Sequence, residues 1–382
     1  AAAILALWVA SAVLAASNLA FLPRLRRARP PAAPRVSMIV PARNEERALE
    51  APLCALLAQD YPDFEVVLVN DQSTDRTGEI ARAVASTDVR LRVIDGEPPP
   101  PGWLGKPWAH HQGAQAATGE LLLFVDADVH YETSALAAAV AEIERSGAGL
   151  LSVLPRVEMR GFWEHVLMPQ LALAAFAFLP TALVNHVRAA RLAIGGGTGI
   201  LIRRAVYDAA GGHVALRDAV IDDISLARIG ARIAPLRLVV ASDLVGVRMY
   251  HGLREIVAGF TKNFYFVIGA RLPVAAAIIA VSVVIHVAPW VWGVALLADL
   301  QRGASLSAAS ILGAAALVWI HLTRLLVYVP LRYGVANALF AHLPMVAVWT
   351  WIAIRSTWEV GVRRRVGWRG RTYDARIKRF GG

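Results

Sequence analysis

The sequence has few charged residues and a single cysteine. Charged side chains account for 18% of its 382 residues and apolar ones for 57%, above the share of about one half that is usual in soluble globular domains. The lone Cys54 excludes an intrachain disulfide bond and a cysteine-based zinc cluster, and its leucine neighbours predict that it belongs to a core. The composition therefore predicts a membrane protein with a soluble portion.

Charge is absent from the first 22 residues, a stretch long enough for one helical membrane crossing, which takes about 20 residues. A cleavable signal peptide would have a basic segment before its apolar run, whereas here the basic run "RLRRAR" (Arg24 to Arg29) follows it. We therefore expect residues 1–22 to be a transmembrane anchor, with its N-terminus outside and the basic run in the cytosol.

The net charge of +10 does not indicate a nucleic-acid partner, because the basic residues cluster beside apolar runs. Positive flanks of membrane segments explain that pattern more simply. Three late apolar stretches predict a transmembrane region of about three helices over residues 272–356, followed by a basic tail over residues 357–382. These stretches are about Leu272 to Leu297, Ser305 to Thr323 and Ala336 to Ile354.

The side of the membrane that holds the basic tail stays open. Three late crossings that begin in the cytosol would leave the tail outside, against the positive-inside tendency. Either a segment broken near Pro330 or Pro344 returns to its own side, or the tail departs from the tendency. We expect Arg324, at the end of one apolar stretch, to extend its charged group toward the membrane surface, with a buried functional arginine as the alternative.

Between the anchor and these stretches, residues 34–250 alternate between strand-like and helix-like patterns. "VSMIVPA" (Val36 to Ala42) and "FEVVLVNDQS" (Phe64 to Ser73) are short apolar runs typical of strands buried on both faces. The alternation continues to "TSALAAAVAEIERSG", a predicted helix that ends at Gly147. This order predicts an α/β fold with a doubly wound, mostly parallel sheet, which binds ligands at the carboxyl ends of its strands.

Two further apolar segments are interrupted or amphipathic. Residues 162–186 contain Glu164, Pro169 and Pro180, so we expect helices that lie in the membrane surface, with a true crossing as the alternative. Residues 251–271 predict an amphipathic basic helix. Both segments would hold the soluble domain against the bilayer.

The run "LLLFVDADVHYE" ends an apolar strand with two aspartates, Asp126 and Asp128. Alternate residues of a strand face the same side, so their carboxylates would repel by roughly 2 kcal/mol at about 7 Å and an effective dielectric near 20. A hard divalent cation such as Mg²⁺ or Mn²⁺ between them would remove that repulsion and hold a diphosphate ligand. A solvated turn is the alternative for these two residues.

A third aspartate, Asp71, also follows a predicted buried strand. We expect the two strands to be adjacent, so that their tips direct carboxylates into one crevice. An Asx turn or a helix cap is the alternative interpretation of Asp71.

Three ordered motifs carry a resemblance to a known family. "VSMIVPARNEE", "FEVVLVNDQSTDRTGEI" and "GELLLFVDADVHYE" resemble the GT-A domain of family 2 glycosyltransferases, over about residues 36–265. "GWLGKPWAHHQGAQAATG", "GGGTGILIRRAVYDAAGGH", "DDISLARIG" and "GWRGRTYD" are similar to stretches of membrane-bound hopanoid-associated and carotenoid glycosyltransferases, with ceramide glucosyltransferase a more distant relative. The resemblance implies a Rossmann-like GT-A domain that uses a nucleotide sugar and a divalent metal.

The resemblance also implies roles for particular residues of the donor site. Asp71 would accept the N–H of a uracil base, Asp126 would contact ribose and metal, and Asp128 would hold the metal on the diphosphate. His130 would join the coordination or shield the site. The remaining residues that match donor-binding positions are Pro41, Arg43, Glu45 and Lys106, and Lys262 would replace the arginine that processive relatives place near the diphosphate.

A base that accepts the proton of the acceptor hydroxyl is implied at Asp223, preceded by Asp222. Crowding of the two carboxylates would raise one pKa toward a useful value. The alternative is that both only cap the helix that follows. A single base opposite the leaving diphosphate inverts the anomeric centre, as this family does.

The remaining motifs concern the acceptor. In relatives the glycine-rich loop lines the acceptor pocket, which makes Gly197 and Thr198 candidates, with a structural turn as the alternative. Processive relatives carry Gln-x-x-Arg-Trp where this chain reads "GFTKNFYF", so the platform for a growing polymer is absent and we expect a single sugar to be added.

The sequence therefore predicts an inverting glycosyltransferase that moves one sugar, from a UDP-sugar, to a lipid hydroxyl such as that of a hopanoid or carotenoid. Nucleotide sugars are cytosolic, so we expect a multi-pass protein of the bacterial cytoplasmic membrane with its catalytic domain in the cytosol. The alternatives are transfer to a polyprenyl phosphate carrier, nucleotidyl transfer, and a non-catalytic membrane scaffold.

Overall fold

The computed structural model describes residues 1–268, 270–368 and 371–374, which form two compact units. The helical unit contains residues 1–21, 159–182 and 250–366, and the α/β unit contains residues 22–158 and 183–249. Part of the predicted basic tail, residues 369–370 and 375–382, lies outside the described residues.

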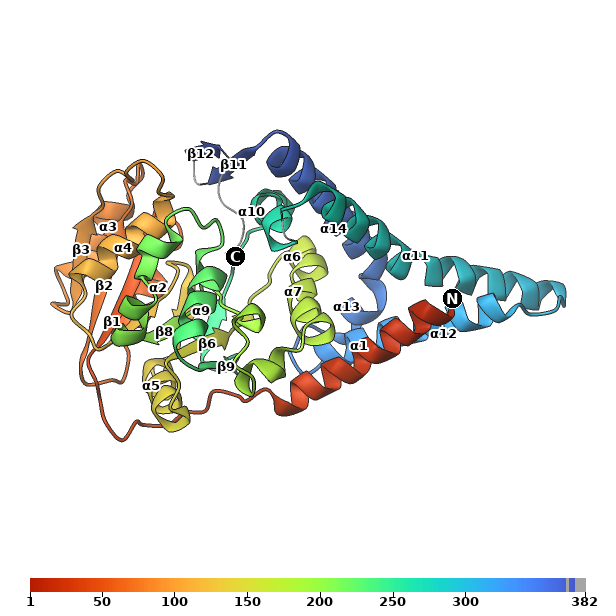
Figure 1. Ribbon diagram of the computed structural model, residues 1–382, viewed down its shortest axis with the longest axis horizontal. Helices are drawn as coiled ribbons and strands as arrows, with labels where there is room; N and C mark the ends of the chain where they lie inside the picture. Colours follow the sequence, from red (N-terminus) through yellow and green to blue (C-terminus); the bar gives the residue numbers. More distant parts are fainter. Residues whose placement is uncertain (269, 369–370, 375–382) are drawn as a thin grey trace. The chain divides into compact units, whose positions relative to one another are not determined.

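The α/β unit is built on a seven-stranded sheet in the order β3-β2-β1-β4-β8-β6-β9 (Figure 1). Only β8 runs antiparallel to its neighbours, so the predicted doubly wound, mostly parallel sheet is confirmed. We expected β2 and β4 to be adjacent, and this was wrong: β1 lies between them and pairs with both. The bounds are β1 Val36–Ala42, β2 Phe64–Asn70, β3 Leu91–Asp95, β4 Leu121–Phe124, β6 Leu150–Leu154, β8 Ile200–Arg203 and β9 Leu236–Val240.

The central strands are buried because helices cover the sheet. Every residue of β1 and of β4 is buried, as the continuous apolar runs predicted. A small sheet of β5 (Val129–Tyr131), β10 (Val245–Val247) and β7 (Arg156–Val157) lies beyond the end of β4. The helices are α2 Glu50–Leu57, α3 Thr77–Ala85, α4 Gly105–Ala116, α5 Ala135–Ser146, α8 Arg204–Ala209 and α9 Asp222–Ile233.

Two local predictions have opposite outcomes. The helix α5 ends at Gly147, which adopts the left-handed conformation (φ 62°) that glycine allows without strain. Cys54 was predicted to be in the core, but it is exposed on α2, whose buried face carries Leu53, Leu56 and Leu57. The cysteine occupies the helical position between the leucines that faces away from the sheet.

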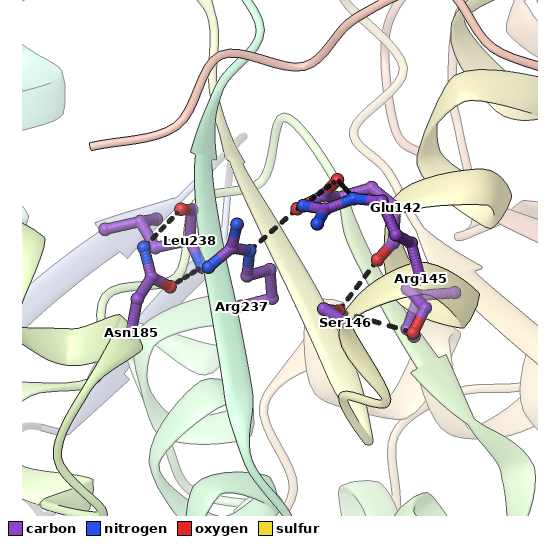
Figure 2. A network of polar contacts seen from close by, with 7 residues as sticks. Glu142, Arg145, Ser146, Asn185, Arg237 and Leu238 are labelled. Carbon is purple, nitrogen blue, oxygen red and sulfur yellow. Dashed lines mark hydrogen bonds and ion pairs between the residues drawn. The ribbon is translucent and has the colours of Figure 1, made fainter. Parts of the chain in front are cut away.

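The edge strand β9 is protected by a side chain. Asn185 donates to the carbonyl of Leu238 (2.9 Å) and accepts from its N–H (2.7 Å), as a neighbouring strand would (Figure 2). From the same strand, the Nε of Arg237 donates to Oε1 of Glu142 on α5 (2.7 Å). The chain near Arg24 forms a parallel bridge with Val240. These contacts satisfy the strand edge, which would otherwise offer a free pairing surface.

Among its described residues, the helical unit contains three helices that are long and apolar enough to cross a membrane: α1 (Ala2–Phe21), α11 (Leu272–Arg302) and α12 (Ala308–Tyr328). The third late stretch of the sequence is not one helix. It is divided into α13 (Val335–Phe340) and α14 (His342–Ser356). The 15 residues of α14 span about 22 Å, less than the roughly 30 Å of a hydrocarbon core.

Proline shapes α11 from within. Pro289 has no N–H to give to the carbonyl of Ile285 one turn earlier. The indole Nε1 of Trp8, on α1, donates to that carbonyl instead (3.1 Å). The contact joins α1 to α11 and satisfies a carbonyl that the helix itself leaves free.

The two interrupted segments form short helices in this unit. The first contains α6 (Phe162–Leu167), α7 (Pro169–Leu173) and one π-helical turn, and the resulting helix is shorter than the three candidate spans. The second is α10 (Leu253–Val267), which buries one face through Ile256, Val257 and Phe260.

Candidate active site

Three segments of the α/β unit meet at the carboxyl end of β4. They are the first turn of α4, the turn after β4, and the first turn of α9, with the glycine-rich loop before β8 beside them. Together they line a small hollow whose charged groups are Lys106, Asp126, Asp222 and Asp223. The other lining residues are His110, Phe124, Gly196, Gly197, Ile200, His213 and Leu226.

Lys106 is the charged centre of this hollow. Its Nζ lies 2.7 Å from Oδ1 of Asp126 and 3.5 Å from Oδ1 of Asp222. Burial alone would lower the pKa of Lys106, but the carboxylates of Asp126, Asp222 and Asp223 raise it well above its usual value. Lys106 therefore carries its charge at every physiological pH.

The positively charged Lys106 is in an electrostatically unfavourable position on its helix, and the nearby carboxylates compensate for this. It is the second residue of α4, where the positive end of the helix dipole disfavours a cation. Asp222 and Asp223 are in the first turn of α9, where the same dipole favours anions. The two helix ends thus supply groups of opposite sign to one hollow, and the lysine holds the acids together.

Asp223 has the properties of a general base. Burial raises the pKa of Asp223 to about 6, with Asp222 and Asp126 adding to the increase and Lys106 opposing it. Its Oδ1 accepts from the N–H of Ile224 (2.7 Å), so one carboxylate oxygen is used in the helix start. The alternative that Asp223 only caps helix α9 accounts for Oδ1 but not for Oδ2. A carboxylate that titrates near 6 can accept a proton near neutral pH.

Asp128 stands in a second acidic group at the same end of the sheet. Burial raises the pKa of Asp128 to about 7, and the carboxylates of Asp126 and Glu45 add to the increase. The proximity of Asp126 and Asp128 was expected from strand alternation, but β4 ends at Phe124 and both aspartates are in the turn that follows. The turn, not the strand, brings the two carboxylates together.

The loops after β1 and β2 are joined to each other. Pro41 is within β1, and Nη1 of Arg43 donates to the carbonyl oxygens of Asp71 (2.6 Å) and Gln72 (3.0 Å). Asn44 and Gln72 both have positive φ, at 52° and 53°, a strained conformation that is typical of functional loops. Asp71 is buried at the end of β2. None of these residues lines the hollow around Lys106.

The glycine-rich loop packs directly against Asp126 and Asp223. A Cβ on Gly197 would lie 1.9 Å from Oδ2 of Asp126, and one on Gly195 would lie 2.4 Å from the carbonyl oxygen of Asp223. Glycine is required at both positions for this close approach. Thr198 directs its Oγ1 to the carbonyl of Val153 (3.2 Å), so its hydroxyl serves the fold.

His130 and Lys262 are also not among the residues that line this hollow. His130 is exposed on β5 and pairs in register with Gly246. Lys262 is on α10, in the helical unit. The residue assignments of the donor and acceptor sites otherwise stay predictions.

Two histidines that the sequence analysis missed belong to the hollow. The rings of His110 and His213 stack with centroids 4.9 Å apart, and Nε2 of His110 lies 3.5 Å from Oδ2 of Asp222. Burial lowers the pKa of His213 to about 3 and that of His110 well below its usual value, so both rings are neutral. His110 follows Lys106 by four residues on α4, and this spacing could have identified it; no comparable pattern marks His213.

Two groups of side chains in the described part of the chain could hold a metal ion. His110, His213 and Asp222 offer ligand atoms within 4.8 Å of one another. Asp128 has its carboxylate close to those of Asp126 and Glu45. Lys106 pairs with Asp222 and with Asp126, whereas Asp128 forms no ion pair with any residue that the structure describes. Carboxylate oxygens suit Mg²⁺ or Mn²⁺, so the all-carboxylate group around Asp128 is the better fit for such an ion.

The fold and the acidic edge of its sheet define an α/β domain of the GT-A class. Residues 37–211 match the family described as "Glycosyl transferase family 2". Two relatives from Staphylococcus aureus, each named 4,4'-diaponeurosporenoate glycosyltransferase, are 28% (strain MRSA252) and 27% (strain USA300) identical over 352 residues, which cover 89% of this chain and 88% of each relative.

A solved structure agrees on the fold. Mannosyltransferase PcManGT from Pyrobaculum calidifontis, in complex with GDP-Man and Mn2+, aligns with a TM-score of 0.56 and 22% identity, covering 94% of this chain and 96% of that one. The chain is a glycosyltransferase with a family 2 domain of GT-A fold.

Proposed function

We propose that this chain transfers a single sugar from a nucleotide sugar to a lipid acceptor and inverts the anomeric centre. The observation that carries the proposal is the convergence of Lys106, Asp126, Asp222 and Asp223 on one hollow at the carboxyl end of β4. The match of residues 37–211 to family 2 supports the reaction class.

The donor would lie along the carboxyl ends of β1, β2 and β4. The loops that contain Arg43 and Asp71 would bind the base, and uracil is the first candidate. PcManGT binds GDP-Man, so guanine is the competing base to test. A Mg²⁺ or Mn²⁺ ion held by Asp128, with Asp126 and Glu45, would neutralise the diphosphate as it leaves. Lys106 would add a second positive charge on the donor side.

The acceptor hydroxyl would give its proton to Asp223. Its carboxylate is anionic above about pH 6 and lies in the same hollow as Lys106. Asp222 would hold Lys106 and His110 in position, because its two oxygens face these two side chains. Gly197, which has no side chain, would allow the carboxylate of Asp126 to lie close to the backbone of the glycine-rich loop.

A lipid acceptor and a cytosolic active site are consistent with the order of the helices. If α1, α11 and α12 cross a membrane and α14 does not, the α/β unit and the basic tail are on the same side. The basic run after α1 is then also on that side, in agreement with the positive-inside tendency. The break between α13 and α14 removes the conflict that three late crossings would create. The names of the relatives favour an acceptor of the carotenoid type, with a hopanoid as the other candidate.

The test is a transfer assay on membranes that contain the full chain. Labelled UDP-sugars and GDP-sugars would be supplied with Mn²⁺, with and without a chelator, and the lipids would be extracted and identified. We expect chelator-sensitive label in a neutral lipid for the wild type and for the control Asp208→Asn, an exposed acid on α8. Label on a polyprenyl phosphate, release of pyrophosphate, or no metal-dependent transfer would each replace the proposal with one of its rivals.

A further inference from the structure

Six polar or amphipathic side chains gather between the apolar helices of the helical unit. They come from α11, α12 and α14, and four of them are almost completely buried. We refer to them as the buried polar cluster. Its members are His286 and Trp290 on α11, His321, Arg324 and Tyr328 on α12, and His342 on α14.

The cluster is continuous. The rings of His286 and His342 have centroids 5.2 Å apart. The ring of His342 is also 6.2 Å from that of Trp290 and 6.0 Å from that of His321, and the rings of Trp290 and His321 are 5.6 Å apart. Nδ1 of His321 and Nε of Arg324 both contact the carbonyl oxygen of Ala338, at 3.1 Å and 2.9 Å.

The sequence led us to expect that Arg324 extends to the membrane surface, but it does not. Its side chain is completely buried, with the guanidinium over the ring of Tyr328 at 4.7 Å. Nε and Nη2 donate to the carbonyl oxygens of Ala338 and Asn337, whereas Nη1 has no partner among the described residues. The buried guanidinium therefore keeps one donor group free.

The charge of Arg324 has no counter-charge within this part of the chain. The helices α12, α13 and α14 contain no aspartate or glutamate, and the one acid of α11 is Asp299, near its C-terminal end. No ion pair joins Arg324 to any residue that the structure describes. A buried charge without a partner is costly, and in membrane proteins it marks a ligand pathway or site.

Other polar atoms of the cluster are also unsatisfied. In addition to Nη1 of Arg324, the hydroxyl of Tyr328, Nε1 of Trp290, and Nδ1 of His286 and His342 are buried without a hydrogen-bond partner in the described part of the chain. Buried polar groups are nearly always bonded in native proteins, so a group of orphans indicates something that binds among them. The hydroxyl, the indole and the guanidinium can all donate.

The ligand that these groups fit is an anion. Three histidines could suggest a metal, but Arg324 would repel a cation. Within the described residues, the grouping suited to a metal is that of His110, His213 and Asp222 in the α/β unit. A planar guanidinium suits a carboxylate or a phosphate.

The surroundings favour an anion that carries an apolar chain. The helices α11 and α12 expose Val281, Val284, Val291, Val318 and Leu322, so the cluster lies within a region suited to hydrocarbon. We propose that the buried polar cluster binds the acidic end of a single-chain or polyisoprenoid lipid, a carboxylate or a phosphate, through Nη1 of Arg324 and the neighbouring donors. This site does not depend on the proposed glycosyl transfer.

The experiment measures equilibrium binding to the purified full chain in a non-ionic detergent. The probes are oleate, oleyl phosphate, oleyl alcohol as the neutral analogue, and acetate or inorganic phosphate as anions without a chain. We expect the two lipid acids to bind at least about tenfold more tightly than oleyl alcohol. Arg324→Gln should reduce this ratio to about one, and the control Arg302→Gln, at the exposed end of α11, should leave it unchanged.

A second variant keeps the experiment informative if Arg324→Gln does not fold. Tyr328→Phe retains the arginine and its carbonyl bonds, and loss of one hydroxyl should weaken oleate about threefold without weakening oleyl alcohol. Equal affinity of oleate and oleyl alcohol for the wild type would overturn the proposal. Competition by acetate or inorganic phosphate at the same concentration as oleate would overturn the lipid assignment and leave an adventitious ion only.

Discussion

Lys106 in the α/β unit is partly exposed and Arg324 in the helical unit is completely buried, and the two cations differ in what surrounds them. Lys106 has carboxylates at 2.7 Å and 3.5 Å, with Asp223 close enough to affect its pKa. Arg324 has two backbone carbonyls, an aromatic ring and no acid among the described residues. The first charge is balanced by the chain itself, whereas the second is not.

This difference predicts the charge of the ligand that each region binds. Around Lys106 the acids outnumber the cation, so a further positive charge, such as a metal ion with its nucleotide, is favoured at this edge of the sheet. Around Arg324 the cation exceeds the acids, so an anion is favoured. The experiments that follow alter one side of this comparison at a time.

The largest effect is expected for Asp223→Asn. The amide keeps the shape and can still accept from the N–H of Ile224, but it cannot take a proton from the acceptor. We expect kcat to fall by about 10³-fold with little change in nucleotide affinity, measured by sugar transfer and by nucleotide titration. Full activity in this variant would show that Asp223 is not the base, and Asp208→Asn is the matched control.

A smaller loss is expected for Lys106→Met. The substitution leaves Asp126, Asp222 and Asp223 without their cation and removes a positive group from the donor side. We expect kcat/KM to fall by about 10- to 100-fold, the value of one charge-assisted hydrogen bond, and Lys106→Arg to recover part of it. Unchanged donor affinity in both variants would argue that the lysine only supports the fold.

The pH profile should report on Asp223. Its pKa is raised from 3.8 to about 6 in the folded chain, so the anionic base is lost as the pH falls through 6. We expect kcat/KM to fall about tenfold per pH unit below 6, and this limb to be absent from the residual activity of Asp223→Asn. For the same group, the folded state holds its proton more tightly than the unfolded state, so its contribution to stability decreases as the pH rises from about 4 to 6.

A substitution at one site should have little effect on ligand binding at the other. If the units act separately, Arg324→Gln should change the nucleotide affinity by less than about twofold, and Lys106→Met should change the binding of oleate by as little. Titration of both ligands into both variants measures this. A large cross effect would show that the two cations belong to one coupled system.

The smallest effect is expected for Asn185→Ala at the edge of β9. The variant loses both hydrogen bonds to Leu238, and the free energy of unfolding should fall by about 1–2 kcal/mol. A lower melting temperature with unchanged kcat is the expected result. A loss of activity at an unchanged melting temperature would mean that the loop containing Asn185 acts in catalysis.

Much of the α/β unit could be predicted from short-range patterns. The runs Val36 to Ala42 and Phe64 to Asn70 are strands because a continuous apolar run can be buried on both faces of a sheet. The order of the strands was less accessible, and placing β2 beside β4 was wrong, because pairing depends on contacts between distant parts of the chain. The direction of Asp126 and Asp128 was predicted from the alternation of a strand, although β4 ends before them.

The helical unit was harder to predict from hydropathy. The apolar stretch Ala336 to Ile354 continues across the break at Ala341, where helix α13 ends. The carbonyls of Asn337 and Ala338 bond to Arg324 on another helix, and such long-range contacts leave no mark in a local pattern. For Arg324 we favoured a side chain at the membrane surface over a buried one, and for Cys54 a place in the core. Both choices were wrong, because the residues around each do not specify which face the helix buries.

The most direct test is the position of Mn²⁺ in a crystal of the full chain grown with a nucleoside diphosphate. The anomalous signal of the metal should lie within coordination distance of the Asp128 carboxylate, beside the diphosphate and on the Asp126 side of Lys106. A metal bound only by His110, His213 and Asp222, or a nucleotide bound away from the ends of β1, β2 and β4, would contradict the account.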